Sequence, residues 1–378
     1  MKTVKLGSLG EIFIGLTYKP DEIADDGTIV LRSSNIQNGC LDFDDIVRVK
    51  CNIKDKLYVR ENDILMCSRN GSAQLVGKCT LIPKLNEVMT FGAFMTIIRT
   101  PINSFIRYYF DSDNFRKQVK GSATTTINQI TRSMLEEIEI PFYKAEEQQK
   151  IAITLTKIYD LISLRKQQLS KLDELVKSRF IELFGDQESN PFGWEQCSIG
   201  ECCTLKSGTS LPAEVENEGG SIPYVKVGDM NYPGNERYIT TSSRYVSEET
   251  AGKGLFEVGS IIFPKRGGAI GTNKKRMTKL PICADLNVMG VSSNGQLLPE
   301  YLLAYFDMID LGALSDGSSV PQINNKNIAP LVICVPPMDL QKQFATFVEQ
   351  TGKSKSKIQK SLEQIETLKK ALMQKYFG

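Results

Sequence analysis

The sequence contains no histidine, the side chain that serves most often as a general base near neutral pH. Ser-His-Asp and Cys-His catalysis are therefore excluded, and so are zinc sites that mix cysteine with histidine. No stretch approaches the roughly 20 apolar residues of a membrane-spanning helix, and no secretory signal follows the first residues. No Gly-x-Gly-x-x-Gly motif follows a strand-like segment, so no dinucleotide or methyl-donor site is recognisable. We expect a cytoplasmic protein without membrane contact and without catalytic, cofactor or metal sites of its own.

The nine cysteines include no Cys-x-x-Cys pair, and the closest group is Cys197, Cys202 and Cys203. An odd number of cysteines without an export signal is typical of reduced thiols rather than of a disulfide framework. We therefore expect free thiols.

Two segments resemble known motifs only superficially. The run Gly71–Cys79 is one residue too long for a phosphate-binding loop, and it ends on cysteine where that loop needs Ser or Thr. The run Asn190–Trp194 lacks the second proline of the adenine methyltransferase motif Asn-Pro-Pro-aromatic, and we interpret it as a linker. A catalytic thiol or carboxylate, such as Cys67 or Asp285, is an alternative that lacks an accompanying acid-base group.

The 378 residues are enough for roughly two to three folded domains, and they contain an internal repeat. Residues 146–152 align with residues 339–345, and the same offset of 193 continues to the Phe-Gly pairs at 184–185 and 377–378. A repeat of this kind predicts two copies of one architecture.

Weaker sequence similarity precedes the two long repeated segments. The run 121–141 aligns with 317–337, with Ile127-Asn128 opposite Ile323-Asn324. Nearer the N-terminus, Leu9-Gly10-Glu11 answers Ile199-Gly200-Glu201, and residues 62–65 answer 259–262. The low identity in these parts predicts two lobes that share a fold but present different surfaces.

The repeated segments carry apolar residues at alternating three- and four-residue steps, which is a heptad pattern. The second is broken at Thr351, Lys355 and Lys369, and both end at glycine, the usual residue after a helix. A helix of about 40 residues is about 60 Å long, more than one small lobe can cover. We expect the two helices to pair antiparallel, although two unrelated surface helices are an alternative.

The remaining segments predict strand-rich lobes, because short β-branched or apolar runs alternate with Gly, Asn and Asp turns. Helices are expected at 104–120 and 299–311, with their aromatic residues in the core. The predicted fold class is α+β, with two similar mixed α/β domains joined by two long antiparallel coiled-coil helices in a pseudo-twofold arrangement. The expected parts are a first lobe at 1–145, a first helix and linker at 146–190, a second lobe at 191–338, and a second helix at 339–378.

Loops rich in Gly, Ser and Asn carry basic residues in both halves. This composition suits a surface that binds DNA. Glycine lets the backbone approach closely, Arg and Lys neutralise phosphates or read guanine, and Asn or Gln can pair with adenine. Any one such loop is equally consistent with a solvated turn, and the net charge of +2 decides nothing. The candidate DNA-binding residues are Arg69, Asn70, Ser72, Lys78, Asn128, Gln129, Lys265, Arg266, Lys274, Lys275, Arg276, Gln322, Asn324, Asn325 and Lys326.

The order of a variable lobe, a Gly-Ser, Ile-Asn and Pro run, and a helix beginning Glu-Gln-Gln-Lys-Ile-Ala resembles the DNA specificity subunits of type I restriction-modification systems. The resemblance spans the chain, is strongest over 121–194 and 317–378, and includes Phe192-Gly193-Trp194-Glu195 at the start of the second lobe. It implies two target recognition domains that each read half of a split, asymmetric site in double-stranded DNA.

The resemblance also implies partners that supply the chemistry. Two modification subunits, docked on the helices, would bind S-adenosylmethionine and methylate adenine, and motor subunits would use ATP and Mg²⁺ and cleave DNA. The alternative is a two-lobed scaffold that binds proteins without contacting DNA.

Overall fold

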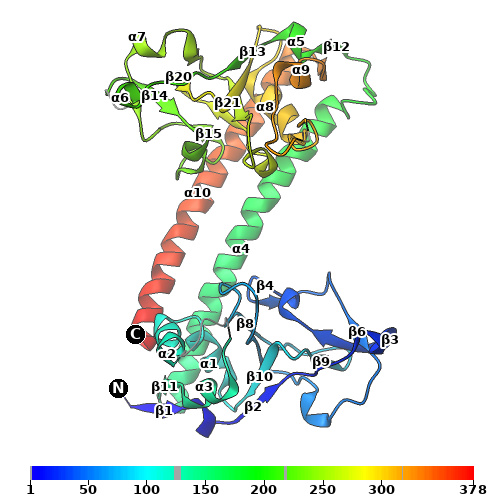
Figure 1. Ribbon diagram of the computed structural model, residues 1–378, viewed down its shortest axis with the longest axis vertical. Coiled ribbons are helices and arrows are strands. Elements are labelled where there is room, and N and C mark those ends of the chain that lie inside the picture. The colour runs from blue at the N-terminus through cyan, green and yellow to red at the C-terminus, as the bar shows by residue number, and fades with distance from the viewer. Residues whose placement is uncertain (1, 123–128, 217–218, 317) are drawn as a thin grey trace. The chain divides into compact units, whose positions relative to one another are not determined.

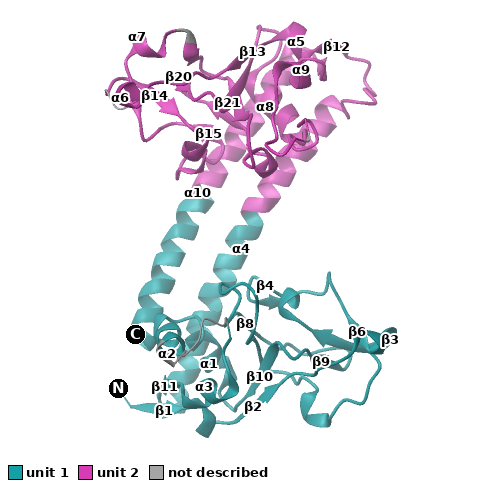
Figure 2. Cartoon of the chain, viewed as in Figure 1, with its two compact units in different colours: residues 1–168, 358–378 teal, residues 169–357 magenta. Residues whose placement is uncertain are grey.

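Two long helices follow from the repeated heptads: α4 (Ala145–Phe184) and α10 (Met338–Phe377), each of 40 residues and each followed by glycine. The computed structural model describes residues 2–122, 129–216, 219–316 and 318–378 (Figure 1). The chain divides into two compact units, residues 1–168 with 358–378 and residues 169–357 (Figure 2). Each unit contains one lobe and a part of each long helix.

The lobe of unit 1 is built on two sheets. One is antiparallel, in the order β2-β10-β7-β8, and the other has the order β6-β3-β9, with β3 and β9 parallel. Strand β1 pairs with β11, so the chain closes the lobe just before α4 begins. The elements are β1 (Thr3–Lys5), β2 (Glu11–Ile14), β3 (Ile23–Leu31), β4 (Ile36–Gln37), β5 (Cys40–Leu41), β6 (Arg48–Val49), β7 (Ile64–Cys67), β8 (Cys79–Leu81), β9 (Met89–Phe91), β10 (Met95–Arg99), α1 (Asn103–Tyr109), α2 (Asp113–Ser122), α3 (Arg132–Glu137) and β11 (Glu139–Pro141).

The lobe of unit 2 repeats this plan with one additional strand in each of its two larger sheets, and its described residues form no counterpart of the β4-β5 pair. Its first sheet has the order β13-β21-β18-β19-β15, and its second has the order β16-β14-β20-β17, with β14 and β20 parallel. Strand β12 pairs with β22, as β1 pairs with β11. The elements are β12 (Glu195–Ser198), α5 (Ile199–Cys202), β13 (Cys203–Ser207), α6 (Ala213–Glu216), β14 (Ile222–Val225), β15 (Tyr238–Ile239), β16 (Tyr245–Val246), α7 (Glu248–Ala251), β17 (Leu255–Phe256), β18 (Ile261–Pro264), β19 (Arg276–Thr278), β20 (Ile282–Ala284), β21 (Val288–Ser293), α8 (Pro299–Met308), α9 (Asn325–Ile328) and β22 (Val332–Val335).

The shared plan confirms the predicted fold class and corrects the register of the repeat. Leu6 N donates to Ile138 O at 2.9 Å, and Ile199 N donates to Leu331 O at 2.8 Å, so Leu6 and not Leu9 is equivalent to Ile199. The offset of 193 therefore holds at the start of the lobes as well as in the helices. The match of Leu9-Gly10-Glu11 with Ile199-Gly200-Glu201 was misleading, because similar residue types do not show which main-chain groups are equivalent.

A second register also shifts by three residues. Ile130 N donates to Ser68 O at 2.8 Å, and Ile323 N donates to Lys265 O at 2.9 Å. Ile130 therefore takes the position that the sequence alignment gave to Ile127, which lies outside the described residues.

Within each unit the two long helices run antiparallel. In unit 1, Leu155 of α4 lies in one core with Met373 and Phe377 at the end of α10. In unit 2, the rings of Phe180 and Phe184 at the end of α4 are each 5.5 Å from that of Phe344, near the start of α10. The expected core aromatics of the lobes, such as Tyr109 and Tyr301, are fully buried.

The expected helix at 104–120 is two helices, α1 and α2. The chain turns at Asp111 and Ser112, whose amides donate to Tyr108 O and Tyr109 O, and the hydroxyl of Ser112 accepts from Phe115 N at 3.2 Å. A serine that caps a new helix explains the break.

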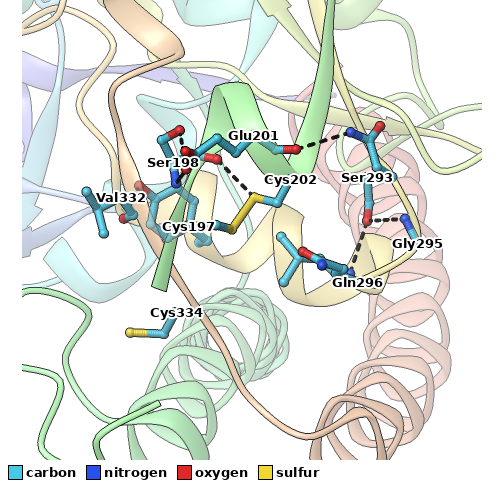
Figure 3. The surroundings of a disulfide bond; sticks show 12 residues. Cys197, Ser198, Glu201, Cys202, Ser293, Gly295, Gln296, Val332 and Cys334 are labelled. Carbon is cyan, nitrogen blue, oxygen red and sulfur yellow. Dashed lines mark hydrogen bonds between the residues drawn. A yellow bond between two sulfur atoms is a disulfide. The ribbon is translucent and has the colours of Figure 1, made fainter. Parts of the chain in front are cut away.

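Cys197 and Cys202 form a disulfide, which contradicts the expectation of free thiols for this pair (Figure 3). The turn from β12 into α5 brings their Cα atoms to 6.2 Å, and Ser198 N donates to Glu201 Oε2 within that turn at 2.9 Å. The other seven cysteines, all in described parts of the chain, are free.

Among the described residues no helix combines the length and the hydropathy that crossing a bilayer requires. The same residues contain no group of three or more Cys, Asp or Glu side chains suited to a metal ion.

Candidate nucleic-acid interface

In unit 1, the loop after β7 is fixed by main-chain hydrogen bonds to two distant segments. Ser68 N and Arg69 N donate to Phe94 O at 2.9 and 3.1 Å, and Arg69 forms an isolated antiparallel bridge with Gln129. The Arg69 side chain is exposed, and Gln129 is half-buried. We call residues 68–72, 94 and 129 the unit 1 loop cluster.

Unit 2 contains the same arrangement after β18. Lys265 N donates to Asn287 O at 2.8 Å, and Arg266 forms an isolated antiparallel bridge with Gln322. Arg266 is exposed, and Gln322 is half-buried. We call residues 265–268, 287 and 322 the unit 2 loop cluster. Each unit thus brings together one candidate arginine and one candidate glutamine.

Asn70 and Ser72 belong to the unit 1 loop cluster, and Lys78 lies close to it, since its carbonyl oxygen accepts from Cys67 N at 2.8 Å. Asn70 Nδ2 donates to Ser33 Oγ at 3.2 Å, which connects the loop after β7 to the loop after β3. The amide oxygen of Asn70 accepts from Ser72 N at 2.9 Å, so the side chain also shapes its own turn. Lys78 is half-buried, with Nζ 3.5 Å from Gln37 Oε1. Asn128 lies outside the described residues.

In unit 2, Lys265 Nζ donates to Ser207 Oγ at 2.9 Å, which connects the loop cluster to the end of β13. Asp316 lies beside Gln322, whose backbone N–H donates to Asp316 Oδ1 at 3.1 Å. Hydrogen bonds from Ser318 hold the pKa of Asp316 below its ordinary value. The carboxylate is therefore a fixed negative charge beside this loop cluster.

The segment after Gln322 carries three further candidates. Asn324 is the N-cap residue of α9, and its backbone N–H donates to Asn327 Oδ1 at 2.9 Å. Asn325 and Lys326 are exposed on that helix. Lys274, at a distance along the chain, is hydrogen-bonded to Asn231.

Lys275 is a correction to the predicted interface, because its amine is buried inside the lobe, and Arg276 is also hydrogen-bonded within the lobe. Lys275 is 4% exposed and donates to Ile309 O at 2.6 Å and to Asn273 Oδ1 at 2.8 Å. Burial lowers the pKa of its amine to about 8. Arg276 donates to three backbone carbonyl oxygens, and burial lowers its pKa as well. The buried Lys275 amine is not available to a phosphate, whereas Arg276 is half-buried and its role in the interface stays a prediction.

Sequence reasoning missed the glycines that allow the loops to approach. A Cβ atom on Gly15 would lie 2.1 Å from Gly92 O, and one on Gly208 would lie 2.1 Å from Asp285 O. Gly15 and Gly208 are separated by the same offset of 193, which is the signal that could have found them. It also missed Phe94, an exposed aromatic residue at the tip of the unit 1 loop cluster.

The two residues considered for an enzyme serve the fold instead. Burial raises the pKa of the Cys67 thiol, which donates to Arg69 O at 3.6 Å. Asp285 Oδ1 accepts from both the backbone N–H and the side-chain amide of Asn287, and its Oδ2 accepts from the Tyr224 hydroxyl at 3.3 Å. Both groups are occupied in holding turns.

The duplicated fold and its paired loop clusters agree with the sequence family that the chain matches. A profile of the family described as "Type I restriction modification DNA specificity domain" matches residues 1–174 and again residues 191–367. The chain belongs to this family. It is therefore a specificity subunit of a type I restriction-modification system, the non-catalytic component that recognises DNA sequence.

Relatives and solved structures agree with this assignment. The chain is 25% identical over 316 residues to the type I restriction enzyme MjaIX specificity subunit of Methanocaldococcus jannaschii, covering 77% of this chain and 72% of that protein. It is 22% identical over 400 aligned positions to the EcoKI specificity subunit of Escherichia coli K12, covering 96% and 85%. The crystal structure of a type I S subunit from M. genitalium has the same fold, with a TM-score of 0.62 at 18% identity over 100% of this chain and 96% of that one.

Proposed function

We propose that each lobe reads one half of a bipartite, asymmetric DNA site through its loop cluster. The observation that carries the proposal is the repeated bridge, Arg69 with Gln129 and Arg266 with Gln322. An arginine can bind guanine O6 and N7 or a phosphate, and a glutamine can pair with adenine N6 and N7. The same two residue types, held in the same main-chain frame, suit one binding mode used twice.

Asymmetry of the proposed site follows from the positions where the two frames differ. Ser68 and Lys265 are equivalent, because each donates its N–H to the turn before β10 or β21 and accepts from Ile130 or Ile323. One is a buried hydroxyl residue and the other carries a cation. Different side chains on one frame favour different half-sites.

We further propose that the long helices dock two modification subunits, which bind S-adenosylmethionine and methylate adenine, while motor subunits use ATP and Mg²⁺. Support comes from aliphatic side chains that α4 leaves in solvent: Ile153, Leu161 and Leu164 are 49%, 42% and 53% exposed. Ile153 and Leu164 are three helical turns apart and Leu161 is one turn from Leu164, so the three lie on one face. An exposed apolar stripe of this kind suits a protein partner.

The decisive experiment maps methylated adenines in the host genome and footprints the assembled complex on the mapped site. The expected result is a split motif and two protected blocks, both lost when Arg69 and Arg266 are replaced by alanine. A single short block contradicts the bipartite site. If the chain assembles with its partners but neither the chain nor the complex binds DNA, the protein-binding scaffold is supported instead.

A further inference from the structure

Phe94 is an apolar side chain fixed at the tip of a polar loop cluster. It lies with Ala93 in the turn that begins at Gly92, and it immediately precedes β10. Its carbonyl oxygen accepts from the backbone amides of Ser68 and Arg69 and from Ser68 Oγ, at 2.9, 3.1 and 3.1 Å. The backbone at Phe94 is therefore held by three hydrogen bonds, while its side chain is 59% exposed.

The ring is also held in place from one side. The guanidinium carbon of Arg69 lies 5.5 Å from the centroid of the Phe94 ring, within the range of a cation-π contact. A ring ordered before binding loses little conformational entropy when a ligand covers it. The exposed apolar surface therefore favours an apolar partner group that reaches the loop cluster.

The equivalent position in unit 2 is not apolar. Met95 N donates to Gly92 O at 2.8 Å, and Val288 N donates to Asp285 O at 2.9 Å, so Phe94 corresponds to Asn287. The Asn287 amide donates to Asp285 Oδ1 at 2.8 Å and is used within its own turn. The frame is shared, but only unit 1 presents an aromatic group on it.

We propose that Phe94 packs against the 5-methyl group of a thymine in the half-site that unit 1 reads. This inference rests on the proposed function. The thymine methyl is the apolar group that base edges offer in the major groove, and phenylalanine is among the side chains that contact it. Base pairs rise by roughly 3.4 Å, so Arg69, 5.5 Å from the ring, can reach the same base pair or the next one. Phe94 thus sets a preference for thymine that unit 2 lacks.

The test removes the methyl group from the DNA and the ring from the protein in a two-way comparison. The full chain, assembled with its methyltransferase subunits, is titrated with duplexes in which each thymine of the mapped site is replaced in turn by deoxyuridine. The wild-type complex is expected to lose about three- to fivefold in affinity at one thymine of the unit 1 half-site, the effect of one buried methyl group. Phe94→Ala is expected to lose at least as much on normal DNA and to bind both duplexes equally.

Val88→Ala is the matched control, because Val88 is 64% exposed in the same lobe and lies before β9, at the other end of that strand from the turn that contains Phe94. This variant should keep the full deoxyuridine effect. The inference is overturned if Phe94→Ala binds normally, if it retains the deoxyuridine effect, or if the unit 1 half-site contains no thymine. Failure of the proposed function has a different signature, since Arg266→Ala in unit 2 would then leave DNA affinity unchanged as well.

Discussion

Asp63 and Arg99 form a buried, bidentate ion pair in unit 1. Arg99 Nε donates to Asp63 Oδ1 at 2.8 Å and Arg99 Nη2 to Asp63 Oδ2 at 2.6 Å, and Asp63 is 2% exposed. The strand pairs Ile64 with Ile98 and Ile261 with Val291 place Ser260 and Ser292 at the equivalent positions of unit 2. Their hydroxyl oxygens are 2.8 Å apart. Two hydroxyl groups thus occupy the place of two charges on the same frame.

This relationship predicts the outcome of a double-mutant cycle. Asp63→Ala should destabilise unit 1 by about 3 to 5 kcal/mol, because it leaves the largely buried Arg99 cation without its partner. The double variant Asp63→Ser with Arg99→Ser should lose clearly less than the sum of the losses of its two single variants, because it copies the hydroxyl pair of unit 2. Hydrogen exchange of the β7 and β10 amides measures this, since the single tryptophan, Trp194, lies in unit 2. Additive losses would show that the pair is not coupled.

Lys275 predicts a pH dependence of the stability of unit 2. Its pKa in the folded chain is about 8, lowered from 10.5 by burial. Between these values the unfolded chain holds a proton that the folded chain has released, so the contribution of Lys275 to stability rises with pH across this window and is flat below it. Relative to Lys275→Met, the free energy of unfolding followed by Trp194 fluorescence should therefore increase from pH 8 to about 10. Parallel profiles for the two proteins would refute the assignment.

Arg266→Ala should lower DNA affinity and make it less dependent on salt. Each phosphate contact that is lost removes about 0.9 from the slope of log affinity against log salt concentration. The same change at Arg69 should behave alike if both bridges serve one binding mode. Lys342→Ala is the control, because Lys342 is an exposed cation on α10, outside the loop clusters. An unchanged slope for Arg266→Ala would remove this loop from the interface.

Exchange of residues 1–145 for the corresponding lobe of another family member should change one half of the methylated motif and leave the other half intact. The reciprocal exchange of residues 191–338 should change only the remaining half. Sequencing that detects adenine methylation provides the readout for both chimaeras. If both halves change together, the lobes do not read DNA independently.

The double variant Leu161→Glu with Leu164→Glu should abolish assembly with methyltransferase subunits, because charges replace the exposed aliphatic face of α4. Ser170→Glu is the control, since Ser170 is six residues from Leu164 and lies on a different face. Gel filtration of the mixed subunits measures assembly. Binding of both variants as tightly as the wild type would place the docking surface elsewhere.

The sequence predicted the long helices well, because the heptads and the terminal glycines are local features of each helix. The unbroken offset of 193 shows the same features twice. It placed the starts of the lobes three residues out of register, since Leu6 and Ile199 are equated by their main-chain bonds to Ile138 and Leu331. Every residue except proline carries the same main-chain N–H and C=O groups, so hydrogen bonds between them do not require a particular residue type. The fold class could therefore be predicted while the alignment within it could not.

The candidate site divides in a similar way. The repeat presents an arginine and a glutamine twice, and the structure brings Arg69 to Gln129 and Arg266 to Gln322, but contact of these residues with DNA stays a prediction. Lys275 was misread as part of a DNA-binding loop, because nothing in the composition of that loop signals that its amine reaches the backbone at the end of α8. The pairing of Cys197 with Cys202 likewise depends on a turn that cysteine counting does not reveal.

The loop cluster of unit 1 is held by main-chain hydrogen bonds at Ser68, Phe94 and Ile130. Its folding therefore depends on backbone groups, whereas its choice of target depends on side chains. Any residue except proline supplies the same N–H and C=O groups, so substitutions at the tips of these loops need not weaken the scaffold that carries them. A lineage could therefore acquire a new target by point changes at a handful of positions, without an intermediate that fails to fold. Selection for altered targets and selection for stability would act on nearly separate sets of atoms.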